Sequence, residues 1–272
     1  RNYLEQSANA HLFDKLLSVG APHKGTAYAY PAWSAGEIWN ADFFFRMYLT
    51  ILVNRCMSTH GISAREAVQT YVPVVQNLLP TESYLRDNRT NTLTPLPEMT
   101  AQNNWLPTTR FALPFYGATV GALSGTGEQT LREIKVKAPT PHDTNGGNWL
   151  DGRPLARVNS TEGDGTVLTD SSSVQGVNNT ILPLDHLELV TDPTGRSAIV
   201  DFLGVNAAQK IQNETFPKPT SALVVLVNNA SAWLTSPDGT TSRDSKGLMV
   251  FLNPKKGRYK FVLVQKNFSL RG

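Results

Sequence analysis

One short stretch of the sequence, residues 158–192, contains an acid and a base that could act together. Asp164 lies in a Gly-Asp-Gly turn, and His186 follows the apolar segment 181–184 after one further residue. The flanking glycines let the backbone turn sharply, so the carboxylate can project from a strand end. The apolar segment is typical of a buried strand that opens into a loop. An acid and a histidine at neighbouring strand ends are two members of a nucleophilic triad, in the chain order acid then histidine.

Other side chains compete for these roles. Asp170 and Asp185 are rival acids, but Asp185 directly precedes His186, and neighbouring side chains on an extended segment point apart. We therefore expect Asp164 to be the partner of His186. His23 follows another predicted strand and could border the same site; because a triad needs one base, we interpret it as a loop histidine bonded to backbone.

Several segments together resemble the lipase and lecithin-cholesterol-acyltransferase-like branch of the α/β-hydrolase superfamily. Residues 163–167 read G-D-G-T-V, which carries the acid in that branch, and Asp185-His186 matches the D-H that carries the base. Residues 16–26 resemble the segment V-G-T-P-H-x-G-S, with Ala21 in place of threonine, and residues 78–85 resemble L-L-P-T-x-x-Y-L of the lid. The resemblance covers roughly residues 1–204.

The resemblance implies a serine ester hydrolase acting on acyl esters, with Asp164 and His186 as acid and base. In that family the nucleophile lies in G-x-S-x-G, ahead of a helix that would lead into residues 1–6. The sequence contains no G-x-S-x-G, and residues 121–125 have the wrong spacing. We therefore expect a C-terminal portion of a larger protein, with the serine and the missing N-terminal half of the hydrolase domain upstream. A lipid acyltransferase with the same triad, and a non-catalytic binding or structural protein on this scaffold, remain alternatives.

The patterns around this stretch predict an α/β fold, namely the C-terminal half of a hydrolase sheet over residues 1–215. Strands are expected at residues 13–19, 111–120 and 131–137, and a loop over 139–153 is expected to lead to the acid. Asp192 and Pro193 indicate the start of a helix that ends at Gly204.

A helical insertion rich in aromatic side chains is predicted from about residue 27 to 110. Ser63 and Glu66 form a capping box at the start of one helix, which Pro73 should kink. The insertion resembles a lipase lid, whose apolar inner face would cover an acyl pocket. Its candidate substrate contacts are aromatic: Trp33, Trp39, Phe43 and Phe44. The alternative is that these aromatics form the ordinary core of a helical subdomain.

A small antiparallel β domain is predicted over residues 221–272, beyond a proline-containing linker at 216–220. Segments 223–227, 231–234, 248–252 and 259–264 read as strands separated by turns. The module resembles the β-sandwich modules appended to secreted bacterial lipases. Two roles remain open for this module: it binds substrate or cell wall, or it supports the lid.

The composition argues against several other classes of function. The 272 residues include 25 basic and 22 acidic side chains, and the basic residues are scattered, so no nucleic-acid partner is expected. One cysteine excludes an intrachain disulfide, and five dispersed histidines lack metal-ligand spacing, so neither a metal nor another cofactor is expected. No run approaches the ~18 apolar residues of a transmembrane segment. The polar, low-charge, cysteine-poor composition favours a secreted or extracytoplasmic prokaryotic protein.

Overall fold

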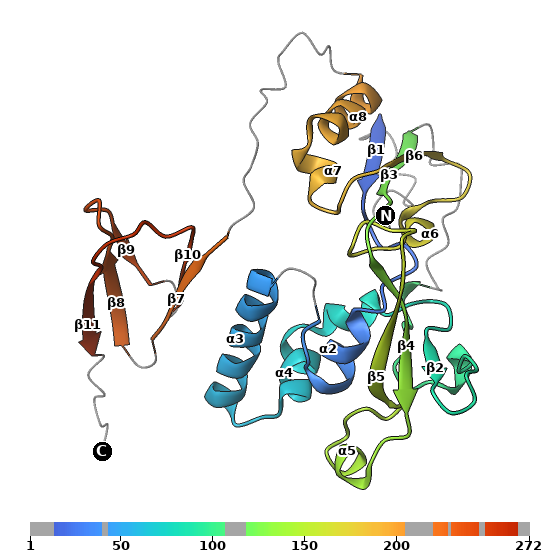
Figure 1. The fold of residues 1–272 in the computed structure, drawn as a ribbon, viewed down its shortest axis with the longest axis horizontal. Helices are drawn as coiled ribbons and strands as arrows, with labels where there is room; N and C mark the ends of the chain where they lie inside the picture. The colour runs from blue at the N-terminus through green and yellow to red at the C-terminus, as the bar shows by residue number, and fades with distance from the viewer. Residues whose placement is uncertain are drawn as a thin grey trace. The chain divides into compact units, whose positions relative to one another are not determined.

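The computed structural model describes residues 14–39, 43–106, 118–204, 220–227, 230–244 and 248–265. The chain divides into two compact units, Arg1–Thr215 and Phe216–Gly272. The first combines helices with strands, and the described part of the second contains strands (Figure 1). The protein therefore has a mixed α/β fold with several small sheets. The helix expected to lead into residues 1–6 lies outside the described residues.

A three-stranded parallel sheet carries the candidate site at one end. Its strands are β1 (Lys15–Val19), β3 (Thr119–Gly125) and β6 (Asn178–Leu182), in the spatial order β1-β3-β6. Leu17 lies opposite Gly121, and Gly125 lies opposite Leu182. Because all three strands are parallel, their carboxyl ends meet at one edge of the sheet, where open α/β sheets bind ligands.

Strand β3 lies further along the chain than the sequence predicts. The prediction placed it at 111–120, of which 111–117 lie outside the described residues, whereas the structure has Thr119–Gly125. Packing requires both glycines of this strand. A Cβ on Gly121 would lie 2.5 Å from Cε2 of Phe202, and one on Gly125 would lie 2.6 Å from Cβ of Asp164. Glycine in a strand thus marks close approach of other groups.

A second sheet includes the hairpin of the chain that lies between β3 and Asp164. It contains β2 (Leu85–Asp87), β4 (Thr130–Lys137) and β5 (Arg153–Ser160) in the order β2-β4-β5, with β4 and β5 antiparallel. Strand β4 confirms the strand predicted at 131–137. The predicted loop at 139–153 is wrong in part, because it contains the short helix α5 (Pro141–Asn145) and is followed by β5, which was not predicted. The hairpin returns the chain to the end of β3.

The helical part of the first unit contains α2 (Ala29–Ala35), α3 (Phe43–His60), α4 (Ala64–Tyr71) and the 3₁₀ helix η2 (Pro73–Leu78). The capping box is confirmed: Ser63 Oγ accepts from the Glu66 amide, and the Glu66 carboxylate accepts from the Ser63 amide. The predicted kink at Pro73 is wrong, since α4 ends at Tyr71 and Pro73 begins η2. Proline lacks an amide hydrogen and disfavours α conformation in the preceding residue, which explains the break. Buried side chains join these helices to the second sheet: Tyr30, Leu79, Tyr84, Leu85, Leu131, Ile134 and Trp149.

Short helices complete the first unit. They are η3 (Leu96–Glu98), α6 (Thr169–Ser172) and α7 (Glu188–Thr191), followed by α8 (Pro193–Leu203), and α7 and α8 lie beside the parallel sheet (Figure 1). The limits of α8 are as predicted. Asp192 caps its start by accepting a hydrogen bond from the Thr194 amide, and Gly204 ends it with φ 70°.

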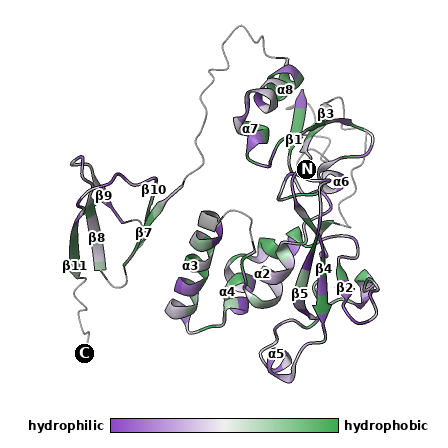
Figure 2. Ribbon diagram, in the orientation of Figure 1, coloured by the Kyte–Doolittle hydropathy of each residue, from purple (hydrophilic) through white to green (hydrophobic). Residues whose placement is uncertain are grey.

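The second unit contains two antiparallel sheets among its described residues. Strand β7 (Ala222–Leu226) pairs with β10 (Leu248–Leu252), and β8 (Ala230–Thr235) lies between β9 (Thr241–Arg243) and β11 (Lys260–Gln265). The four predicted strands are confirmed, and β9 was not predicted. Hydrophobic residues predominate in β7 and β10 (Figure 2). The buried core of this unit is small: Val227, Ala232, Leu234 and Met249.

Candidate functional site

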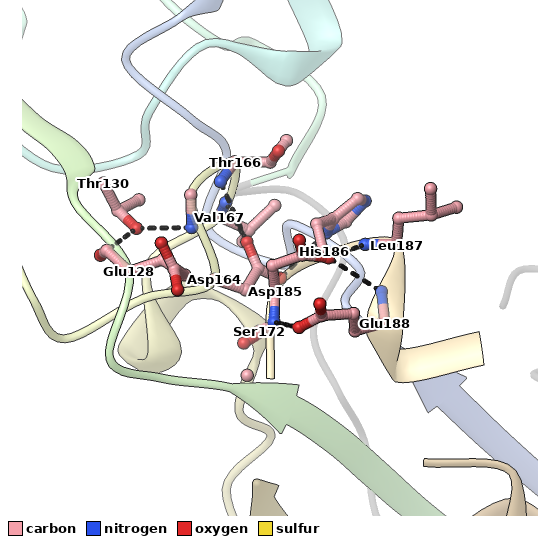
Figure 3. A network of polar contacts seen from close by, with 12 residues as sticks. Glu128, Thr130, Asp164, Thr166, Val167, Ser172, Asp185, His186, Leu187 and Glu188 are labelled. Atoms are coloured by element: carbon pink, nitrogen blue, oxygen red, sulfur yellow. Dashed lines mark hydrogen bonds and ion pairs between the residues drawn. The ribbon is translucent and has the colours of Figure 1, made fainter. Parts of the chain in front are cut away.

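Asp164 is held in a tight turn at the carboxyl end of the parallel sheet. Asp164 is 1% exposed, and Oδ1 of its carboxylate accepts hydrogen bonds from the amides of Thr166 at 3.0 Å and Val167 at 2.7 Å (Figure 3). Taking a carboxylate out of water is costly unless it is hydrogen-bonded. The two amides meet that requirement on one oxygen and leave Oδ2 for another partner.

The second sheet fixes the turn that holds Asp164. Thr130 Oγ1 donates to the Glu128 carbonyl at 2.9 Å and accepts from the Gly165 amide at 2.8 Å (Figure 3). A Cβ on Gly163 would lie 2.4 Å from the same hydroxyl oxygen, and Gly165 has φ 87°. Both glycines are therefore needed for the turn, as the Gly-Asp-Gly sequence indicates.

His186 reaches Asp164 from the segment that follows strand β6. Its amide donates to the Asp164 carbonyl at 2.9 Å, and its ring Nδ1 lies 2.8 Å from Oδ2 of the carboxylate. A carboxylate can only accept, so Nδ1 carries the hydrogen and Nε2 of the neutral ring carries the lone pair. The side chain of His186 is 43% exposed, and its Nε2 makes no hydrogen bond with any residue that the structure describes. Nε2 can therefore accept a proton from a group brought to it.

The Asp185 carboxylate, considered as a rival acid, bonds to backbone amides near His186. Its Oδ1 accepts from the amides of Leu187 at 3.0 Å and Glu188 at 2.8 Å, and its own amide donates to the Glu188 carboxylate at 3.0 Å (Figure 3). These bonds close a turn directly before α7 and fix the backbone on both sides of His186. Asp170 is exposed on α6. Of the three candidate acids, Asp164 is the one bonded to the His186 ring.

The pKa of His186 is raised above its ordinary value of 6.5, mainly because the ring is hydrogen-bonded to Asp164. Partial burial lowers this pKa, and the negative charges of Asp164 and Asp185 raise it further. The net effect favours the imidazolium, as expected beside a buried carboxylate. The same charge would stabilise an imidazolium formed during a reaction.

We expect ¹⁵N NMR of the histidine rings to give a titration midpoint for His186 above 6.5. Because the pKa is higher in the folded chain, His186 contributes stability that is fully present below the unfolded pKa and lost as pH rises through the folded pKa. Chemical denaturation across that range should show the unfolding free energy falling as pH rises, and less so in His186→Gln. A midpoint at or below 6.5 would contradict the hydrogen bond to Asp164.

The aromatic residues predicted to contact substrate divide into two groups. Trp33 and Trp39 pack against the core of the helical region, and the Arg157 guanidinium lies 4.3 Å from the Trp39 ring centre. Phe43 and Phe44 begin α3, and their side chains lie outside what the structure describes. A role in substrate binding stays a prediction for all four.

The His23 ring bonds to a side chain, and whether it also bonds to backbone, as expected, stays a prediction. Its Nε2 lies 2.8 Å from Ser18 Oγ, while its amide donates to the Ser171 carbonyl at 2.8 Å. Ser18 and Thr130 have site-related contacts that the sequence did not reveal. The contact of Ser18 with His23 spans five positions across a turn, and the bond of Thr130 to the Gly165 amide joins segments 35 positions apart. In the sequence, Gly20 directly follows β1, and a glycine at a strand end can indicate that another group packs closely there.

No family model matches the chain, and no curated protein matches it. Among the described residues, no group of three His, Cys, Asp or Glu side chains is placed to hold a metal ion. The helices in that part of the chain are all too short or too polar to cross a membrane. The geometry of Asp164 and His186 therefore carries the functional interpretation.

Proposed function

We propose that Asp164 and His186 are the acid and the base of a serine ester hydrolase of the lipase or esterase type. The supporting observation is the 2.8 Å bond between a buried carboxylate and Nδ1 of a histidine whose side chain is 43% exposed. A triad requires this arrangement: an orienting acid behind the ring and a free nitrogen in front of it. The two residues meet beside the carboxyl end of the parallel sheet: His186 follows β6, and Asp164 lies in the turn that follows the β4–β5 hairpin and packs against Gly125 at the end of β3. This placement supports the comparison with the C-terminal half of a hydrolase sheet.

In this proposal Nε2 of His186 takes the proton of a serine hydroxyl as the oxygen attacks the ester carbonyl carbon. The imidazolium then gives that proton to the leaving alcohol, and a water molecule hydrolyses the acyl-enzyme by the same route. Asp164 keeps the hydrogen on Nδ1 and stabilises the imidazolium. The attacking serine comes from outside these 272 residues, because the sequence has no G-x-S-x-G and no described hydroxyl bonds to Nε2.

The same proposal specifies the substrates and the cellular location. The substrates are acyl esters or lipids, held in part by aromatic residues of the helical insertion that acts as a lid. The enzyme works outside the cytoplasm, and the C-terminal β module binds substrate or cell wall. None of these steps requires a metal or another cofactor.

A fluorophosphonate probe, which labels activated serines, tests the proposal directly. We expect the protein expressed from its complete gene to be labelled on a serine outside these 272 residues, and His186→Ala to abolish labelling. Mass mapping of the labelled peptide identifies the site. Label on a serine within the chain, such as Ser18 beside His23, would show that the base has been misassigned. No label on the folded protein would favour a scaffold that binds without catalysing.

A further inference from the structure

The backbone turn after β1 passes beside the ring of His186 at Gly20. A Cβ on Gly20 would lie 2.9 Å from Cε1 and 3.0 Å from Nδ1 of His186, and 3.2 Å from Cδ1 of Leu189. Carbon atoms of neighbouring groups do not normally approach so closely. The space that a side chain would fill at this position is therefore occupied by the imidazole.

Of the groups around Gly20, the His186 ring has the most freedom to move. Leu189 is fully buried and Asp164 is 1% exposed, so both are confined by their neighbours. The His186 side chain is 43% exposed and can rotate into solvent. An added Cβ should consequently displace the ring from Asp164 and leave the rest of the fold in place.

The turn itself cannot easily move away from the ring. The Gly20 amide donates to the Leu123 carbonyl at 2.8 Å, which continues the pairing of β1 with β3. Further along the turn, His23 bonds to Ser18 through its ring and to the Ser171 carbonyl through its amide, each at 2.8 Å. These bonds hold both sides of Gly20 against the core.

We propose that Gly20 is a positioning residue for His186. Its lack of a side chain, on a turn anchored at both ends, lets the imidazole lie close enough to the strand end for Nδ1 to reach Asp164. The geometric part of the inference stands on the structure alone. Its consequence for turnover rests on the proposed ester hydrolase function.

Gly20→Asn tests the proposal with little backbone strain, because asparagine accepts the left-handed conformation, φ 56°, better than other side chains do. The matched control is Gly61→Asn: Gly61 has φ 66°, and a Cβ there would meet nothing within 4 Å. Gly20→Ala and Gly61→Ala form a second pair with a smaller side chain. The readout on the 272-residue chain is NMR of the His186 ring, with thermal denaturation as the measure of folding.

In both Gly20 variants we expect the His186 pKa to fall and the Nδ1 proton signal to be lost, while the Gly61 variants keep both. Unchanged ring signals in the Gly20 variants would overturn the proposal. Failure of both Gly20 variants to fold, with the Gly61 variants folded, would also overturn it, since the Cβ would then disrupt the fold rather than the ring. In the intact enzyme, Gly20→Asn should reduce kcat by about 100-fold with little change in KM. Absence of ester turnover in the wild type would contradict the proposed function and leave the NMR result valid.

Discussion

Replacing His186 with alanine is expected to reduce kcat for ester hydrolysis in the intact protein by at least about 10⁴-fold. His186 is the proposed carrier of the proton from serine to the leaving alcohol, and no other described side chain is bonded to Asp164 in its place. Without the ring, the serine keeps its proton and the alkoxide-like leaving group has no donor. The measurement is steady-state turnover of a short-chain nitrophenyl ester.

The fold should survive this substitution. The His186 side chain is 43% exposed, so water can enter the space and bond to the freed Oδ2 of Asp164. We expect the unfolding free energy to fall by no more than about 1–3 kcal/mol, the usual cost of losing a hydrogen bond to a charged group. His142→Ala, on exposed helix α5, is the matched control and should retain full activity. Substantial turnover by folded His186→Ala would exclude His186 as the base.

The pairing of Asp164 with His186 could be predicted because a short local pattern in the sequence marks each of the two residues. The Gly-Asp-Gly turn and the short apolar segment before His186 each specify a strand end over a few residues. Helix limits were predictable for the same reason: the caps of α4 and α8 form between residues that are two or three positions apart. The route of the chain was not anticipated: Asp164 follows β5 of the second sheet, and the β4–β5 hairpin returns it to the end of β3, beside the end of β6.

Long-range contacts explain what the sequence did not reveal. Gly121 and Gly125 weaken the strand pattern of β3, and the reason for each lies far away in the chain, at Phe202 and Asp164. Strand β5 is largely exposed and contains a proline, so it lacks the apolar pattern that marks a buried strand. The role of Gly20 is likewise defined by His186, which no local pattern connects to it.

Replacing Asp164 with asparagine is expected to reduce kcat by about 10⁴-fold while keeping the turn intact. The amide oxygen of asparagine can replace Oδ1 and still accept from the amides of Thr166 and Val167. Its NH₂ group then replaces Oδ2, which faces Nδ1 of His186 at 2.8 Å in the wild type. Two donors cannot bond to each other, so Nδ1 must become the acceptor and the ring hydrogen moves to Nε2. In this tautomer Nε2 has no lone pair to receive the serine proton.

Two measurements separate this effect from a general loss of structure. The pKa of His186 should fall in Asp164→Asn, because the hydrogen bond to the carboxylate is the largest cause that raises it and partial burial, which lowers it, remains. Asp185→Asn is the matched control: an asparagine oxygen can still accept from the amides of Leu187 and Glu188, so the turn before α7 and most of the activity should persist. Asp170→Asn, on exposed α6, should also be nearly neutral. If either control lost as much activity as Asp164→Asn, the carboxylate that orients His186 during turnover would not be the one bonded to it in this structure.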